Sequence, residues 1–479
     1  MLRSTKIVAT LGPASSDAAT LERMFLAGVD VVRLNFSHGK AADHVARAQL
    51  VHEIGRKTGR TVGIMADLQG PKIRVGKFKD GKVTLAKGDI FTLDAERELG
   101  DQDGVGLDYK ELPRDSRPGD LLLLNDGLIS LEVLEVQGQK VRCKVIHGGV
   151  LSNNKGINRK GGGLTAPALT AKDMEDILTV AAIKADYLAI SFPKSGADMR
   201  LARKLLHDAG GEAFLIAKIE RAEAVLPDAL RDIMDASDGI MVARGDLAVE
   251  VGDASVPALQ KRMIRLAREM NKVTITATQM MESMISSPIP TRAEVSDVAN
   301  AVLDGTDAVM LSAETASGEY PVEVIESMHR ICVEAEQTQA VVLDQEFLNR
   351  VFTRVDQSIA MGALFTAYHL KVTAIAALTE SGSTALWMSR MNCGVPIYAL
   401  TSQTRTRYRT TLFRDTYPLM VKYAGNSREE SLAEAEAVLV QNGVVKKGDL
   451  IVLTIGEPIG LAGGTNTLKI VRVGERRQG

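Results

Sequence analysis

The sequence predicts an α/β protein: a (β/α)8 TIM barrel with an inserted all-β lid domain and a C-terminal open α/β domain. Three observations predict this fold. Eight short apolar runs alternate with helix-length amphipathic segments, the alternation is interrupted once by a stretch without a long helical pattern, and a second alternation follows the eighth unit. Parallel strands joined by helical crossovers produce such a rhythm, and eight units of this size close into a barrel.

The barrel is assigned to residues 1–69 and 164–342. Helix-length patterns, one of them at 40–57, separate its first strands, and the expected helix at 291–305 begins with Thr291 and carries Glu294 three positions later, the spacing of a capping box. The eight expected strands lie at 6–12, 29–37, 61–70, 186–192, 212–220, 238–247, 273–280 and 307–314.

The interruption, residues 70–163, consists of short strand patterns separated by turn pairs such as Asp80-Gly81 and Asp126-Gly127. It predicts an inserted β-barrel domain, which we call the lid. Gly70-Pro71 opens it, and three glycines, 161–163, with Pro167 close it. Such clusters fit a hinged insertion, and they fit plain turns equally well.

Residues 343–479 form the predicted C-terminal domain. Strand patterns alternate with helical ones here too, and the last two strand patterns follow each other directly. The expected strands lie at 372–379, 395–401, 418–423, 449–455 and 467–473, and the expected helices at 356–370, 383–391, 404–412 and 427–442.

Composition excludes several classes of protein. The 479 residues correspond to about three domains. A count of 58 Lys and Arg against 60 Asp and Glu lacks the basic surplus of nucleic-acid binders, and a 45% hydrophobic fraction is too high for a disordered chain. Three scattered cysteines argue against a disulfide framework. No stretch offers the ~20 apolar residues of a membrane helix, so we expect a cytoplasmic protein.

Polar side chains follow the expected barrel strands, at the end where TIM barrels place their chemistry. Alternate residues of a strand share a face, which pairs Arg33 with Asn35 and Lys218 with Glu220. The alternatives are internal salt bridges or a site in which carboxylates bind a divalent cation, most plausibly Mg²⁺, and cations bind a phosphorylated substrate. The residues at these ends are Arg33, Asn35, Ser37, Asp67, Lys218, Glu220, Arg244, Gly245, Asp246, Thr276, Thr278, Gln279, Ser312 and Glu314.

Several strings together resemble the pyruvate kinase family, in its bacterial form, from Lys6 to about Val473. They are VVRLNFSHG, DLQGPKIR, AKIE, MVARGDL, TATQMMESM, PTRAEVSDVANAV and DGTDAVMLSAETASGEYP. The resemblance implies a barrel with a lid and a regulatory α/β domain. It also implies phosphoryl transfer from phosphoenolpyruvate to ADP, giving pyruvate and ATP in the last step of glycolysis, and a homotetramer.

The resemblance further implies a role for each site residue. Arg33 contacts the phosphoryl group, Lys218 stabilises charge on that group and the enolate, and the backbone of Gly245 and Asp246 with the Thr278 hydroxyl holds the substrate carboxylate. The remaining roles are magnesium binding by Glu220 and Asp246, nucleotide binding by Arg74, Asn35 and His38, and proton delivery to the enolate by Ser312 and Glu314.

Two departures from the family pattern concern the monovalent cation and a short loop. Asn35, Ser37 and Asp67 match the family's potassium site. Lys72, however, stands where potassium-dependent members carry an acidic residue, and Leu68 where they commonly have a hydroxyl residue. We therefore expect the Lys72 ammonium to replace the cation and make K⁺ dispensable. The family's RGDLG reads RGDLA here, a change of little cost if the backbone is helical.

The C-terminal domain contains LTESGSTA, a loop of hydroxyl residues and glycine between a strand and a helix. It is either a phosphate cradle or an ordinary capped helix start. It resembles the family's effector-phosphate loop, which makes Thr379, Ser381, Ser383 and Thr384 the candidate residues for a phosphorylated effector, a sugar monophosphate or AMP.

Two other functions fit the residues less completely. A different magnesium-dependent barrel enzyme acting on pyruvate or phosphoenolpyruvate, such as a lyase or aldolase, has no need of a lid. A non-catalytic metabolite sensor is expected to have lost Lys218 or a metal carboxylate, and this chain retains them.

Overall fold

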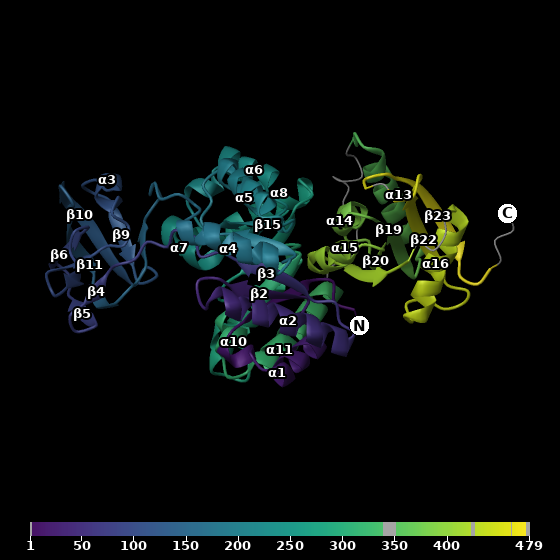
Figure 1. Cartoon of the computed structure of the whole chain (residues 1–479), viewed down its shortest axis with the longest axis horizontal. Coiled ribbons are helices and arrows are strands. Elements are labelled where there is room, and N and C mark those ends of the chain that lie inside the picture. Colours follow the sequence, from purple (N-terminus) through teal and green to yellow (C-terminus); the bar gives the residue numbers. More distant parts are fainter. Residues whose placement is uncertain (1, 339–350, 423–426, 461, 476–479) are drawn as a thin grey trace.

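The computed structural model describes residues 2–338, 351–422, 427–460 and 462–475. Three bodies lie in a row, with the lid at one end, the barrel in the middle and the C-terminal domain at the other end (Figure 1). Eight parallel strands close into one barrel in the order β1-β18-β17-β16-β15-β14-β3-β2, which confirms the predicted TIM barrel. They are β1 (Lys6–Leu11), β2 (Val31–Asn35), β3 (Gly63–Asp67), β14 (Tyr187–Ile190), β15 (Phe214–Ile219), β16 (Gly239–Ala243), β17 (Val273–Ala277) and β18 (Ala308–Leu311).

Helices surround the barrel because each presents one apolar face to the strands, and the barrel's largest core lies between the two layers. The capping box expected at Thr291 and Glu294 is present at the start of α9. The surrounding helices are α1 (Ala18–Ala27), α2 (Ala41–Thr58), α4 (Ala171–Ala182), α5 (Gly196–Asp208), α6 (Pro227–Ala236), α8 (Val256–Glu269), α9 (Arg292–Leu303) and α11 (Pro321–Thr338).

All eight barrel strands end one to four residues earlier than the sequence predicts, and two of them lead straight into a helix. β16 stops at Ala243 and β18 at Leu311, and a helix follows each at once: α7 (Arg244–Val251) and α10 (Ala313–Ala316). A glycine with positive φ, Gly252, ends α7. Several predicted site residues therefore lie in the first turn of a helix instead of on a strand. The backbone at Ala248 is helical, which removes the need for glycine there.

The lid is all-β except for the single turn α3 (Leu112–Asp115). β13-β9-β10-β11-β6-β8 form a six-stranded sheet, and β12-β5 and β4-β7 form two separate pairs. Register shifts within β10 interrupt its ladder with β11. Between the two edges of the sheet, Arg74 bridges to Gly156 beside β13 and Val75 bridges to Leu107 beside β8. The strands are β4 (Lys77–Phe78), β5 (Lys82–Leu85), β6 (Ile90–Asp94), β7 (Leu99–Gly100), β8 (Gly104–Gly106), β9 (Leu121–Leu124), β10 (Ile129–Gln137), β11 (Lys140–His147), β12 (Gly149–Ser152) and β13 (Ile157–Arg159).

The lid joins the barrel through two chain segments. Gly70 in the first has a φ of +65°, and a Cβ there would lie 2.7 Å from Cβ of Ser191. In the second, Leu164 and Ala166 pack into the lid's core, so the lid extends a few residues past the boundary predicted at 163.

The C-terminal domain has a five-stranded open sheet in the order β21-β20-β19-β22-β23, in which only β23 is antiparallel. This agrees with the predicted open α/β domain. Its third predicted strand begins two residues earlier than expected, and the predicted boundary at residue 343 lies outside the described residues. The elements are α13 (Val355–Leu370), β19 (Ala374–Leu378), α14 (Ser383–Ser389), β20 (Ile397–Thr401), α15 (Thr404–Arg409), β21 (Thr416–Met420), α16 (Arg428–Gln441), β22 (Leu450–Gly456) and β23 (Thr465–Arg472).

This domain docks on the end of the barrel opposite the lid (Figure 1). Leu412 and Phe413 complete the apolar cluster inside the barrel. Arg390 forms a short ion pair with Asp307, and both side chains are 1% exposed. Asp307 also accepts the Thr274 N–H at 2.8 Å, so this carboxylate joins the barrel wall to the C-terminal domain.

The three cysteines, Cys143, Cys332 and Cys393, are buried free thiols, which confirms that no disulfide framework supports the fold. Among the helices in the described part of the chain, none combines the length and apolarity needed to cross a membrane.

Candidate active site

Four charged side chains meet at the carboxyl ends of β2, β3 and β15. Arg33 Nε lies 2.6 Å from Asp67 Oδ2, and Lys218 Nζ lies 3.3 Å from Asp67 Oδ1 and 3.1 Å from Glu220 Oε1. The carboxylates are 1–2% exposed, whereas Arg33 and Lys218 each keep 12% of their side chain accessible. The structure therefore brings Arg33 and Lys218 together as predicted, with part of each cation facing the open end of the barrel.

The surroundings shift the pKa values of Asp67, Lys218 and Glu220. Burial by itself raises the pKa of Asp67, but Arg33 and Lys218 outweigh it and hold the pKa below its usual value. Burial lowers the pKa of Lys218, yet Asp67 and Glu220 more than offset this, so the ammonium stays charged. Burial raises the pKa of Glu220 to about 7, against Lys218 and with help from Asp246. Strongly shifted groups in a cleft are typical of functional sites.

Glu220 and Asp246 are the two predicted metal carboxylates, and they are close enough for Asp246 to raise the pKa of Glu220. Glu220 directly follows β15, and Asp246 lies in the first turn of α7. Across the described residues, three or more acidic, His or Cys side chains never gather into a metal-binding group. Two carboxylates suit Mg²⁺, which usually binds one or two of them and completes its octahedron with substrate oxygens and water.

The loop after β17 and the start of α7 are bonded to each other. Thr278 has a φ of +72°, rare for a β-branched residue, and its Oγ1 accepts the Gly245 N–H at 2.8 Å. That N–H is thus paired within the protein, which leaves the Thr278 hydroxyl proton to donate to a ligand. Arg244 fixes the loop by donating to the Thr278 carbonyl at 2.8 Å.

Ser312 and Glu314 lie beyond the last barrel strand, at the start of α10. Glu314 is 1% exposed, and its carboxylate accepts the Ser312 N–H at 2.6 Å and the Met281 N–H at 3.2 Å. Burial raises its pKa. The pair therefore joins the seventh and eighth strand ends.

The side-chain oxygens of two predicted potassium ligands, Asn35 and Asp67, already have partners within the protein. Asn35 Oδ1 accepts the Ser37 N–H at 3.1 Å, while both oxygens of Asp67 contact Arg33 or Lys218. Lys72 lines two clefts between the lid and α7 that Asp246 also lines, and Asn35, Ser37 and Asp67 line neither.

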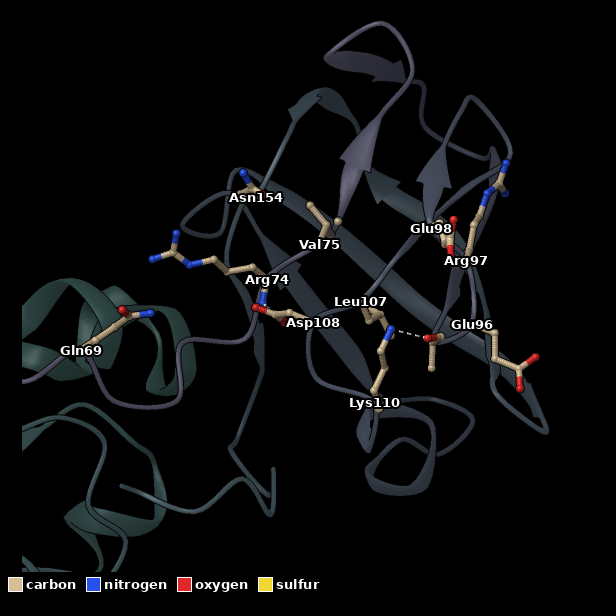
Figure 2. A pocket seen from close by; sticks show the side chains of 12 residues that line it. Gln69, Arg74, Val75, Glu96, Arg97, Glu98, Leu107, Asp108, Lys110 and Asn154 are labelled. Carbon is tan, nitrogen blue, oxygen red and sulfur yellow. Dashed lines mark hydrogen bonds between the residues drawn. The ribbon is translucent and has the colours of Figure 1, made fainter. Parts of the chain in front are cut away.

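A cavity of about 790 Å³ in the lid extends to the barrel edge at Gln69 (Figure 2). The predicted nucleotide residue Arg74 projects from the lid on the side facing Gln69, and its Nε is buried without a hydrogen-bond partner among the described residues. The other two nucleotide candidates lie elsewhere: Asn35 ends β2, and His38 is exposed just after it.

The hydroxyl loop of the C-terminal domain connects β19 to α14. Thr379 and Thr384 line a cavity of about 20 Å³, and Thr384 Oγ1 lies 2.7 Å from the Thr465 hydroxyl. Ser381 and Ser383 hydrogen-bond each other at 3.2 Å and do not line it. Glu380 also lines this cavity.

The sequence reasoning missed two residues that support the charged group. Ser191 Oγ accepts from Lys218 Nζ at 2.8 Å, and Thr10 Oγ1 accepts from Arg33 at 3.1 Å. Ser191 follows β14, whose end carries no charged residue, and Thr10 lies inside β1 in an otherwise apolar run. An inward hydroxyl near a strand end is the signal that identifies both.

Comparisons with known proteins agree with this geometry. The family model "Pyruvate kinase, barrel domain" matches residues 2–325, and "Pyruvate kinase, alpha/beta domain" matches residues 357–471. The chain is 53% identical to "Pyruvate kinase II" of Salmonella typhimurium over 98% of its own length and 99% of that protein. It is 52% identical to "Pyruvate kinase" of Haemophilus influenzae over 95% and 96% of the two chains. The chain therefore belongs to the pyruvate kinase family of phosphotransferases.

Proposed function

We propose that this protein transfers the phosphoryl group of phosphoenolpyruvate to ADP, giving pyruvate and ATP, with Mg²⁺ as its cofactor. The observation that carries the proposal is the arrangement of Arg33, Asp67, Lys218 and Glu220, two fixed cations held by buried carboxylates at the open end of the barrel. Phosphoryl transfer requires mainly positioning and neutralisation of negative charge, and these groups supply both.

Each group has a role that follows from its contacts. Arg33 is held rigidly by Asp67 and Thr10 and neutralises the phosphoryl oxygens. Lys218 remains charged and partly accessible, so it stabilises charge on the transferring group and on the enolate oxygen. The Thr278 hydroxyl and the first turn of α7 bind the substrate carboxylate, since backbone N–H groups at a helix start favour anions.

Two further roles depend on groups at the edges of the site. Ser312 and the buried Glu314 take part in delivering a proton to the enolate carbon, and Arg74 on the lid, with Asn35 and His38 on the barrel, binds the nucleotide phosphates. Closing the lid brings the two sides together and excludes water that competes with ADP for the phosphoryl group.

Glu220 and Asp246 would hold Mg²⁺, and the bound ion would supply positive charge that neutralises the phosphate groups. The raised pKa of Glu220 supports this role, because a carboxylate that is costly to keep charged alone gains most from a nearby cation.

A coupled assay tests this function. Pyruvate formation from phosphoenolpyruvate should require both ADP and Mg²⁺. Lys218→Met should lower kcat by at least about a hundredfold, the scale of removing one preorganised electrostatic group. Lys204→Met, on the exposed face of α5, serves as the matched control and should leave kcat unchanged. Wild-type activity without ADP would contradict the proposal and favour a lyase or aldolase. Inactivity under all conditions would favour the sensor.

Potassium should be dispensable. Lys72 supports this, because it lines the clefts beside Asp246 and supplies a positive charge at the lid end of the site. Activity should persist in buffer with no potassium, and Lys72→Glu should make it depend on added K⁺. Almost no turnover of the wild type without potassium would refute this.

Regulation and assembly are the last parts of the proposal. A sugar monophosphate or AMP binds the loop containing Thr379, Ser381, Ser383 and Thr384 and activates a cytoplasmic homotetramer. Adding the effector should lower the phosphoenolpyruvate concentration that gives half the maximal rate. This effect should be lost in Ser383→Ala, which tests the effector site. Sedimentation mass tests the assembly, and cell fractionation tests the location.

A further inference from the structure

The second connection between lid and barrel is formed by residues 161–166, which we call the return strap. Buried and exposed residues alternate along it. Gly161, Gly162 and Gly163 have φ values of +82°, +79° and +92°, a run that only glycine adopts readily. Gly162, Leu164 and Ala166 are buried, and the residues between them are exposed. The strap therefore presents one edge inward along its whole length.

The inward side chains belong to the lid. Leu164 and Ala166 pack into the lid's apolar core, and the Thr165 N–H donates to Asp115 Oδ2 at 2.7 Å. Because these contacts lie within the lid, the strap must follow the lid when it moves.

Three other backbone groups of the strap, in contrast, are bonded to the barrel. The Gly163 N–H donates to Glu223 through a short hydrogen bond, and the Leu164 carbonyl accepts from Arg221 at 3.0 Å. A Cβ on Gly162 would lie only 2.3 Å from Glu223 Oε2, so the strap approaches this carboxylate as closely as a backbone can. The Gly161 N–H donates to the Glu250 carbonyl at 2.9 Å.

These barrel partners lie on the two elements that carry the proposed metal carboxylates. Glu223 begins the 3₁₀ turn (Glu223–Val225) just after Glu220, and Glu250 lies in α7 one turn after Asp246. The Glu250 carboxylate accepts the Ala222 N–H at 2.8 Å, which ties the two elements to each other. One short segment of the lid is thus bonded to both.

We propose that Glu223 is a positioning residue that couples lid closure to the metal site by holding the return strap against the elements that carry Glu220 and Asp246. When the lid moves, the strap transmits the movement to both elements and sets the spacing of the two carboxylates. This inference rests on the proposed magnesium role of those carboxylates.

The test compares Glu223→Ala with Glu223→Gln, which keeps an oxygen acceptor for the Gly163 N–H. In Glu223→Ala, amide hydrogen exchange of residues 161–166 should accelerate roughly threefold to tenfold without any ligand, the scale of one lost hydrogen bond. The Mg²⁺ concentration for half-maximal activity should rise by a similar factor, while kcat at saturating Mg²⁺ changes less than about threefold. Glu223→Gln should stay close to wild type in both measurements.

Glu175→Ala, an exposed glutamate on α4, is the matched control and should change neither quantity. Gly162→Ala perturbs the same contact from the strap side and should shift both quantities in the direction of Glu223→Ala. Unchanged exchange in Glu223→Ala overturns the inference, and so does faster exchange with unchanged Mg²⁺ activation. The exchange measurement needs no metal, so failure of the proposed function would appear separately, as a wild type that does not require Mg²⁺.

Discussion

Asp67 is the carboxylate on which the geometry of the site depends most, and Asp67→Asn tests this directly. Its two oxygens hold Arg33 Nε at 2.6 Å and Lys218 Nζ at 3.3 Å, and the side chain is 1% exposed. At an effective dielectric constant of about 20, Coulomb's law gives roughly 6 and 5 kcal/mol for these two attractions before desolvation. Breaking a buried pair by removing one partner typically costs about 3–5 kcal/mol.

We therefore expect Asp67→Asn to lower the free energy of unfolding by about 3 kcal/mol or more and kcat by at least about a hundredfold. The second expectation follows because a misplacement of about 1 Å at a reacting centre costs roughly that factor. The pH dependence adds a separate signature. Asp67 is the strongest Coulombic support for the raised pKa of Lys218, so without it this pKa falls and activity at alkaline pH should be lost at a lower pH.

Urea denaturation and pH profiles of kcat measure these effects. Asp208→Asn is a suitable control, because its partner Lys204 is exposed on α5 and such pairs contribute at most about 1 kcal/mol. If Asp67→Asn retained wild-type kcat and an unchanged alkaline limit, Asp67 would not position Lys218 and the reasoning would be refuted.

Three further predictions concern the frame around the site. Burial raises the pKa of Asp186 to about 7, so the folded chain holds a proton between about pH 4 and 7 that the unfolded chain releases; stability should fall as pH rises through this window. Asp186→Asn keeps an acceptor for the Ile64 N–H. The urea midpoint of this variant minus that of the wild type should therefore be larger at pH 8 than at pH 5. The same difference at both pH values would contradict this. Asp307→Asn strands the buried Arg390 and should cost about 3–5 kcal/mol in chemical denaturation, with a loss under 1 kcal/mol counting against it. Gly70→Ala places a Cβ against Ser191 at a residue with positive φ. It should lower the free energy of unfolding by about 1–3 kcal/mol and reduce kcat. A melting temperature and kcat equal to those of the wild type would disprove this.

The order of strands and helices in the barrel and the C-terminal domain could be read from the sequence. Apolar runs and amphipathic segments alternate because each strand must be buried on both faces and each helix on one. The same alternation placed Arg33, Asp67, Lys218 and Glu220 near the ends of β2, β3 and β15, which stop one to three residues earlier than predicted.

The residue at which each strand ends depends on tertiary contacts, which the spacing of residues in the sequence does not predict. Asp246 and Glu314 lie in helical turns, because α7 and α10 begin directly after β16 and β18 and bond to the loop after β17. The register shifts within β10 of the lid likewise depend on contacts between strands, which the local pattern leaves undetermined.

The sequence by itself determined the fold class and the identity of the charged groups, since both depend on residue type and local periodicity. Only the tertiary structure decided which of those groups face one another. It paired Asp67 with both cations, added the hydroxyls of Thr10 and Ser191, and fastened the return strap to the barrel. These contacts join residues far apart in the chain, and closing the barrel is what brings their strands to a common end.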